Sequence, residues 1–137
     1  MLLACWALVA SFSAAYYWLQ YRDVLDRIGG VLIYVNTGVD YGNGTRAWYN
    51  NTKTLTGETL FDVTKQVLNV TYQTSTLGTE VISINNVRKQ GSFGWTYWIW
   101  NGTSSSWSIV WENADEYRVA NGETFMWYYQ NSFNPPP

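Results

Sequence analysis

The sequence predicts an α+β domain, a mainly antiparallel sheet with one packed helix, preceded by an N-terminal apolar helix of transmembrane type. The apolar helix is predicted because residues 2–19 contain no charged side chain. From residue 31 onward, short aromatic and β-branched runs alternate with turns that contain Gly and Asn, which is typical of antiparallel strands. One stretch, residues 59–68, instead carries apolar side chains at helical spacing. We therefore divide the chain into an apolar anchor or assembly helix at 1–30, a β-rich domain at 31–130 and a Pro-rich tail at 131–137.

The uncharged segment is the first predicted element. As a helix, residues 2–19 span about 27 Å, close to the ~30 Å hydrocarbon thickness of a bilayer. The cluster Tyr16-Tyr17-Trp18 at its end is typical of a membrane–water interface. Residues 22–28 continue the helix with apolar side chains on one stripe and charges on the other. We expect residues 2–28 to contact membrane lipid or neighbouring subunits.

A cleaved signal peptide is the alternative for the same segment. Ser13-Ala14-Ala15 has the small residues of a cleavage site, but the basic residue that normally begins a signal peptide is absent. Leu2-Leu3-Ala4-Cys5 resembles a bacterial lipobox, although it lies too near residue 1 to follow a full signal sequence. Cys5 is the single cysteine in the sequence, so no intrachain disulfide forms.

The β-rich domain begins with a predicted hairpin. Val31–Asp40 form the first strand, with an irregularity expected near Gly38. The Gly42-Asn43-Gly44 turn then leads into a return strand that begins at Ala47. Gly57 separates this strand from the segment with helical spacing.

The predicted helix starts after Thr59, a suitable N-cap residue. Asp62 in the first turn places a carboxylate near the free N–H groups of the helix N-terminus. Leu60, Val63 and Val67 recur at helical spacing and predict the face that packs on the sheet. The helix is therefore expected to support the core.

The remaining strands are predicted from shorter patterns. Residues 69–73 and 80–85 each form one strand, and residues 94–111 form an aromatic hairpin. Residues 117–119 and 124–129, joined across Asn121-Gly122, are expected to close the domain as a last hairpin. The tail at 131–137 contains Pro135-Pro136-Pro137, which cannot extend a sheet, and is expected to be exposed.

The aromatic hairpin supplies the candidate interaction residues. Its first arm ends in Asn101-Gly102, which provides the positive φ angles of a two-residue type I′ turn. Alternation places Trp95 and Tyr97 on one face and Trp98 and Trp100 on the other. The hairpin has more rings than one face of a small domain needs, so we expect some to contact a partner chain or ligand. The alternative is that all of them pack inside the domain. The candidates are Trp95, Tyr97, Trp98, Trp100, Trp107 and Trp111.

Four Asn-x-Thr sequences predict sites of N-glycosylation and hence an extracellular domain. The acceptor residues are Asn43, Asn50, Asn69 and Asn101. Asn43 and Asn101 are favoured because both are predicted in turns. The alternative is a polar, turn-rich β surface without sugars.

Five segments occur in an order that resembles the DUF4430 family, over about residues 31–130. They are Asp40–Thr45, Thr59–Val63, Val81–Val87, Tyr97–Gly102 and Gly122–Trp127. That family is similar to the C-terminal β-domain of transcobalamin and intrinsic factor. The resemblance implies a β-grasp-like α+β fold on exported or surface-attached proteins of archaea and bacteria. It also implies corrinoid binding as a less favoured function, because the α-barrel domain that supplies half of the corrinoid site in transcobalamin is not in this sequence.

The composition argues against catalysis. The sequence has no histidine, the side chain that most often serves as a base near neutral pH. We predict that the protein is not an enzyme, with no catalytic residue, no cofactor and no metal site. The acidic loop Glu112–Glu116 and the Asp40–Gly44 turn are the alternatives for calcium, which prefers carboxylate and carbonyl oxygens. With 8 Lys and Arg residues against 10 Asp and Glu residues, nucleic acid is not an expected partner.

These features together predict a function based on contact. We expect a non-enzymatic, single-pass protein of the cell membrane whose β-domain faces the extracellular side. It would act as an accessory or interaction subunit of a cell-surface or membrane assembly, with other protein chains as partners. The alternative is a structural subunit of a pilin-like extracellular filament, with the apolar helix buried among its copies.

Overall fold

The computed structural model describes residues 11–20 and 31–137. The chain divides into two compact units, Met1–Val31 and Leu32–Pro137. Residues 11–20 form a helix, as expected, whereas the other parts of the predicted 2–28 segment lie outside the described residues. Neither the 11–20 helix nor any helix within 31–137 is long and apolar enough to cross a membrane.

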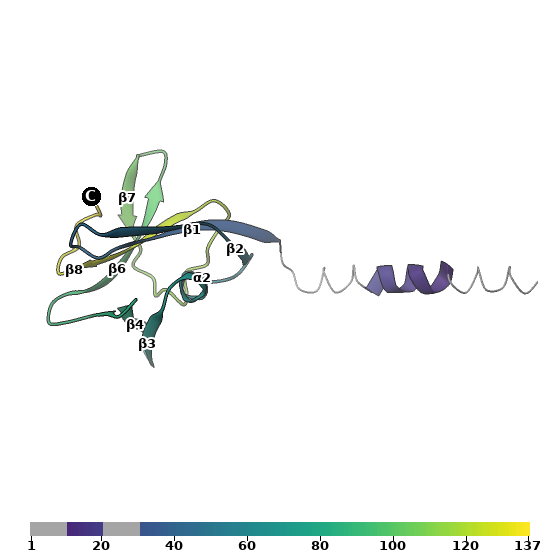
Figure 1. Ribbon diagram of the computed structural model, residues 1–137, viewed down its shortest axis with the longest axis horizontal. Coiled ribbons are helices and arrows are strands. Elements are labelled where there is room, and N and C mark those ends of the chain that lie inside the picture. The colour runs from purple at the N-terminus through teal and green to yellow at the C-terminus, as the bar shows by residue number, and fades with distance from the viewer. Residues whose placement is uncertain (1–10, 21–30) are drawn as a thin grey trace, which may run out of the picture. The chain divides into compact units, whose positions relative to one another are not determined.

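The larger unit is built on a five-stranded sheet (Figure 1). The strand order is β2 (Arg46–Leu55), β1 (Leu32–Asp40), β8 (Thr124–Gln130), β6 (Gly94–Asn101) and β7 (Ser106–Ile109). β8 runs parallel to β1, and all the other neighbouring strands are antiparallel. The prediction of a mainly antiparallel sheet is therefore confirmed, with the last strand of the chain inserted at its centre.

A second layer covers one face of this sheet. It contains α2 (Leu60–Val67) and a three-stranded sheet in the order β3 (Val70–Ser75), β4 (Gly78–Ile84) and β5 (Val87–Arg88). Figure 1 shows α2, β3 and β4 on one side of the five-stranded sheet, while the β6–β7 hairpin rises on the other side. We call the side toward α2 the core face and the opposite side the second face.

The core forms between these two layers. In the parallel pairing of β1 with β8, odd-numbered residues stand beside odd-numbered residues, so their side chains share one face. Their odd-numbered side chains point to the core face, where they meet the apolar side of α2. Thr59 caps α2, accepting a hydrogen bond from the Asp62 N–H, and the Asp62 carboxylate accepts one from the Thr59 N–H. The fully buried apolar contributors are Val35, Val39, Leu60, Val63, Ile84, Phe125 and Trp127.

Two predictions about strands and turns are wrong. Residues 117–119 are not a strand, because β8 already has β1 and β6 on its two sides and offers no free edge. They instead bond the helix start, where Leu60 N–H donates to the Tyr117 carbonyl over 2.8 Å. The β6–β7 connection is also longer than a two-residue turn, since Asn101 pairs with Ser106 and the positive φ of 49° falls on Ser105.

The expected irregularity of β1 lies two residues earlier than predicted. The pairing of β1 with β2 shifts between Val35 and Thr37, not at Gly38. Gly38 has a different role, because a Cβ atom there would lie 2.8 Å from the Met126 Cε atom and 2.9 Å from a ring carbon of Trp48. The glycine therefore makes room for two large side chains on the second face.

The tail at 131–137 forms no strand and most of its residues are exposed, as expected, but its end contacts the β-rich domain. Pro136 is buried, and the Arg46 guanidinium donates a hydrogen bond to the Pro137 carbonyl over 2.8 Å. The same guanidinium forms an ion pair with Asp40 at 2.7 Å. A proline segment without strand hydrogen bonds is thus held by a side chain of β2.

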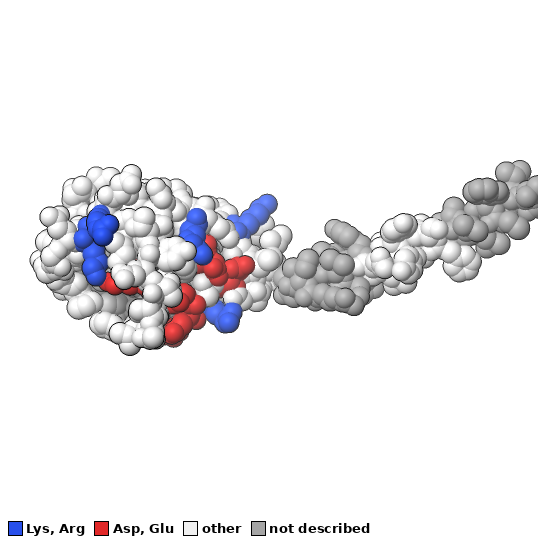
Figure 2. Space-filling model, turned by 90° about the horizontal axis from the view of Figure 1, so that it is seen from below, with Lys and Arg blue, Asp and Glu red and all other residues white. Residues whose placement is uncertain are grey.

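Charged side chains are sparse on the face of the domain seen in Figure 2. In that view, Lys and Arg side chains lie near Asp and Glu side chains, and most of the surface is uncharged. Among the described residues, Lys89 and Glu80 form an ion pair. Apolar and neutral polar groups therefore dominate what this face offers to a partner.

Candidate functional site

The six predicted aromatic residues separate into three groups in the structure. β6 pairs with β8 without any register shift, so its side chains alternate strictly between the two faces. Trp95 and Tyr97 lie on the core face, while Trp98 and Trp100 lie on the second face with Trp107 of β7. Trp111 follows β7 and belongs to neither group.

Trp95 and Tyr97 are partly buried and have structural partners. The Trp95 indole N–H donates to the Val87 carbonyl over 2.9 Å, which ties β6 to the three-stranded sheet. The Tyr97 hydroxyl donates to the Glu112 carbonyl. Burial, together with the smaller effect of the nearby carboxylates, Asp115 first, raises the pKa of Tyr97 to about 12.

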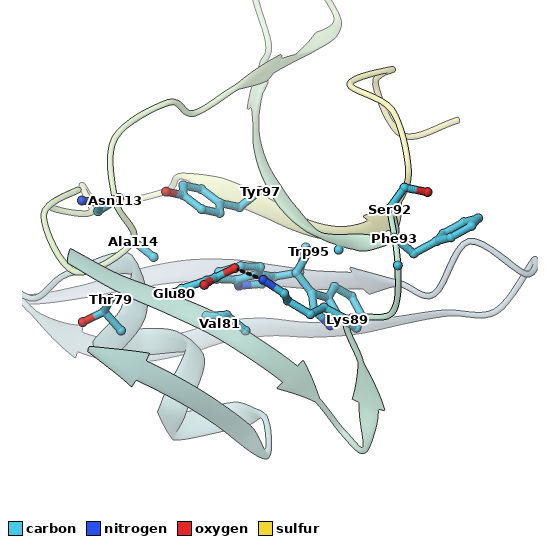
Figure 3. Close-up of a pocket in the computed structure, with 13 residues that line it drawn as sticks. Thr79, Glu80, Val81, Lys89, Ser92, Phe93, Trp95, Tyr97, Asn113 and Ala114 are labelled. Atoms are coloured by element: carbon cyan, nitrogen blue, oxygen red, sulfur yellow. Dashed lines mark hydrogen bonds and ion pairs between the residues drawn. The ribbon is translucent and has the colours of Figure 1, made fainter. Parts of the chain in front are cut away.

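These two residues also line a pocket between β4 and β6 with a volume of about 330 Å³ (Figure 3). Trp127 also lines the pocket, and Figure 3 shows the Lys89–Glu80 ion pair among the lining residues. The volume is at the lower end of the ~300–1,000 Å³ typical of ligand pockets. The pocket is therefore large enough for a small molecule, and its lining combines aromatic rings with one ion pair.

Trp98 is the buried centre of the second face. Only 4% of its surface is exposed, and its indole N–H donates to the Thr96 hydroxyl over 2.9 Å. It stands opposite Met126, which is also fully buried, and Met126 stands opposite Gly38. Trp98 is therefore a packing residue, as expected if rings of the aromatic hairpin pack inside the domain.

Three tryptophans around it form an exposed cluster that we call the tryptophan surface, defined as Trp48, Trp100 and Trp107. The Trp100 and Trp107 rings lie 5.2 Å apart edge to face, and Trp107 stacks on Trp48 at 6.4 Å. Trp48 and Trp100 are 41% and 40% exposed. Trp48 comes from β2 and Trp107 from β7, the two edge strands, so the rings bridge the whole width of the sheet.

Trp111 lies apart from this surface and is 74% exposed. Its ring contacts Phe133 of the C-terminal segment at 5.4 Å. Phe133 is itself 65% exposed, so the pair forms a small separate apolar patch.

Sequence reasoning missed Phe133 and also Trp48, because both lie far from the hairpin along the chain. The one available signal for Trp48 was its position in the return strand opposite Gly38.

All four sugar-acceptor asparagines are exposed. Asn43 lies in the β1–β2 turn, Asn69 between α2 and β3, and Asn101 at the end of β6. The side-chain oxygens of Asn43 and Asn101 accept hydrogen bonds from the N–H groups of Thr45 and Thr103, both over 3.0 Å. Asn50 lies within β2, where the β1–β2 pairing is shifted.

The Asp40–Gly44 turn, one of the two calcium alternatives, has a carboxylate that already binds other groups of the protein. Both carboxylate oxygens of Asp40 are engaged, one by the Gly42 N–H at 2.9 Å and the other by Arg46. An arginine in this position competes directly with a cation. Within residues 11–20 and 31–137, no group of three or more His, Cys, Asp or Glu side chains gathers closely enough to hold a metal ion.

Comparison with solved structures defines the fold as β-rich and transcobalamin-like. The crystal structure of haptocorrin in complex with Cbi matches with a TM-score of 0.63 and 16% sequence identity, covering 74% of this chain and 25% of the haptocorrin chain. The chain therefore spans about a quarter of haptocorrin. A 1.30 Å crystal structure from Ruminococcus gnavus ATCC 29149, of a protein provisionally described as metal binding, matches with a TM-score of 0.57 and 13% identity. That match covers 74% of this chain and 99% of the other.

No protein-family model and no curated sequence matches the chain. The sequence identities to the two solved structures are low, so these structures establish the fold alone. The resemblance to DUF4430 is not confirmed by a family match.

Proposed function

We propose that this protein is a non-enzymatic, extracytoplasmic contact domain, held at a membrane by its N-terminal segment, that serves as an accessory or interaction subunit of a cell-surface or membrane assembly. Its partner is another protein chain, which binds the tryptophan surface. We also propose that the domain is a β-grasp-like member of DUF4430, which the parallel pairing of β1 with β8 and the ordered motifs support.

The tryptophan surface is the observation that carries this proposal. The described chain covers the core face with α2 and the small sheet but leaves Trp48 and Trp100 about two-fifths exposed on the second face. Trp is among the residues most enriched at binding hot spots, because one ring buries a large area with few rotatable bonds. The rings also pack on one another, so little conformational freedom is lost when a partner docks.

The N-terminal unit supports attachment to a membrane or to neighbouring subunits. The helix at 11–20 exposes large apolar side chains, including Phe12 at 74%, Tyr17 at 71% and Leu19 at 59%. Exposed apolar side chains of this size favour contact with lipid or with a partner chain. The four exposed sugar acceptors favour an extracellular position for the β-domain.

Co-purification from native membranes tests the proposal. We expect a tagged full-length chain to retain a partner chain that Trp100→Ala loses. Leu77→Ala is the matched control, because Leu77 is 87% exposed in the β3–β4 loop, outside the tryptophan surface. Equal recovery of the partner with both variants would contradict the proposal.

The filament alternative predicts a different partner, a second copy of the same chain. Shearing of cells separates the two functions, since a filament is released intact while an anchored subunit stays with the membrane until detergent is added. Recovery of long homopolymers of this chain in the sheared fraction would replace the accessory-subunit proposal.

A small-molecule function is the second candidate, favoured by the likeness to haptocorrin in complex with Cbi. The pocket between β4 and β6 is the place for it, because Trp95 and Tyr97 offer rings on which a planar ligand stacks. Titration with cobinamide should then quench tryptophan fluorescence, and Trp95→Phe should weaken that quenching. Unchanged fluorescence at millimolar cobinamide would remove this candidate.

A further inference from the structure

The shifted register in β2 creates a local site at the edge of the tryptophan surface, with which it shares Trp48. Val35 pairs with Thr52 and Thr37 pairs with Tyr49, so two residues of β2, Asn50 and Asn51, stand opposite Asn36 alone. This is a β-bulge, in which the extra residue turns neighbouring side chains toward one face. Asn51 adopts the left-handed conformation with φ 55°, which asparagine tolerates better than most residues.

Asn36 of β1 fixes this bulge. The Asn51 N–H donates to the Asn36 side-chain oxygen over 2.9 Å, and the Asn36 amide donates to the Thr124 hydroxyl over 3.3 Å. On the other side, the Thr52 hydroxyl donates to the Tyr49 carbonyl over 3.3 Å. Two hydrogen bonds therefore hold the backbone around Asn50, and Asn36, the acceptor in one of them, is itself bonded to Thr124.

The bulge opens into a groove of about 450 Å³ on the second face. Its lining is uncharged and consists of Asn36, Trp48, Asn50, Asn51 and Thr124. Within the described chain, the Asn50 side chain is exposed and makes no hydrogen bond. Amide groups both donate and accept hydrogen bonds, as sugar hydroxyls do, so the lining suits a neutral polyhydroxylated group better than an ion.

We propose that Asn50 carries an N-linked glycan whose first sugar lies in this groove against the Trp48 ring. Asn50-Asn51-Thr52 is the acceptor sequence, and Trp48 precedes the acceptor by two residues on the same face. The inference rests on the extracytoplasmic position in the proposed function. In the transfer, the Asn50 Nδ2 atom bonds the anomeric carbon of a polyprenyl-diphosphate-linked oligosaccharide, the glycosyl–phosphate bond breaks, and the amide loses one proton.

The physics of the contact explains why a tryptophan stands there. The C–H groups on one face of a pyranose carry partial positive charge and meet the negative face of an aromatic ring. Trp107 stacks on Trp48, yet Trp48 stays 41% exposed. A sugar on the free part of the ring would shield it from water and leave Trp100 for the proposed partner chain.

The other three acceptors lack this arrangement. Two residues before Asn69 is Val67, and two residues before Asn101 is Ile99. Asn43 does follow a tyrosine at that spacing, but Tyr41 packs against the core and its ring contacts Trp95 at 5.9 Å. Of the four acceptors, Asn50 alone has an exposed ring on its own face at that spacing.

Single-acceptor variants of the full chain, secreted from a eukaryotic host, test the inference. The Asn50-only variant carries Thr45→Ala, Asn69→Gln and Thr103→Ala, which keep the turn bonds made by Asn43 and Asn101. The matched control is the Asn69-only variant, with Asn50→Gln in place of Asn69→Gln. Glycopeptide mass spectrometry measures occupancy, and thermal unfolding compares each glycosylated protein with the same variant made without sugar in a bacterial cytoplasm.

We expect high occupancy at Asn50 and a glycan that raises the midpoint of the Asn50-only variant by roughly 2–8 °C, the effect of one aromatic contact in a domain of this size. Trimming to the first sugar should keep this rise, and the Asn69-only variant should show none. Trp48→Leu should abolish the rise, whereas Trp48→Phe should retain much of it.

Three results would overturn the inference: an unmodified Asn50 beside a modified Asn69, an equal midpoint shift in both single-acceptor variants, or a rise that survives in Trp48→Leu. If Trp48→Leu does not fold, the comparison of Asn50-only with Asn69-only decides alone. The proposed partner chain is tested separately through Trp100→Ala, so failure of either idea leaves the other measurable.

Discussion

The two faces of the five-stranded sheet use the same kinds of residue for different purposes. On the core face, Phe125 and Trp127 are at most 1% exposed and pack against α2. On the second face, Trp48 and Trp100 are about two-fifths exposed and mainly contact another tryptophan. The second layer buries the rings of the core face, whereas on the second face Trp98 is buried but Trp48 and Trp100 stay available for contact.

The largest expected effect comes from the core face. Trp127 fills the centre of the core, and its indole N–H donates to the Thr64 hydroxyl over 2.9 Å. Trp127→Ala should lower the free energy of unfolding by about 3–5 kcal/mol, because it leaves a cavity and removes the hydrogen bond that the Thr64 hydroxyl accepts, although this hydroxyl still donates to the Leu60 carbonyl. Urea unfolding measures this, and a loss below about 1 kcal/mol would mean that the core face is not the main source of stability.

Gly38→Ala tests the packing of Met126 and Trp48 on the second face, and its effect on the free energy of unfolding should be intermediate. The added methyl group would lie within 3 Å of both Met126 and Trp48, so one of them must move. We expect a loss of about 1–3 kcal/mol, typical of overpacking. Indole fluorescence of Trp48 should change at the same time. Unchanged stability together with unchanged fluorescence would show that the two rings are loosely held.

The loss of stability in alkaline solution should be a smaller effect. Tyr97 titrates near pH 10 in the unfolded chain and at about 12 in the folded domain. Between these values the unfolded chain loses a proton that the folded domain keeps, so the free energy of unfolding falls as pH rises from about 10 to 12. Burial also raises the pKa of Tyr117, whose hydroxyl donates to Glu123, and adds to the same trend.

Tyr97→Phe should flatten this alkaline slope, which unfolding series at pH 9 and pH 11.5 would measure. Tyr34→Phe is the matched control, because the Tyr34 ring is 42% exposed on the second face. An equal slope in both variants would mean that the Tyr97 hydroxyl is not held in its protonated form by the fold.

Much of the core face could be predicted from the sequence. The helix after Thr59 and its buried residues follow from local spacing and capping, and these interactions span only a few residues. The failed strand at 117–119 shows the limit of such reasoning. Its pattern suits a strand, but β8 pairs with β1 and β6, and this long-range choice is not visible in local sequence.

The second face could be predicted only in part. Alternation along β6 correctly separates Trp95 and Tyr97 from Trp98 and Trp100, because the pairing of β6 with β8 has no bulge. Trp48 and Trp107 lie 59 residues apart in the sequence, on the two edge strands. No local pattern predicts that their rings meet. The burial of Pro136 likewise depends on the fold, since Arg46 holds the last residues from β2.

Trp100→Ala should have the smallest effect on stability and is the most direct test of the central claim that the second face is a contact surface. The measurement pairs thermal unfolding of the variant with recovery of the partner chain from native membranes. We predict a cost of no more than about 1 kcal/mol, because the ring is 40% exposed, together with clear loss of the partner. A large loss of stability with full recovery of the partner would instead make the tryptophan surface a second core and contradict the account.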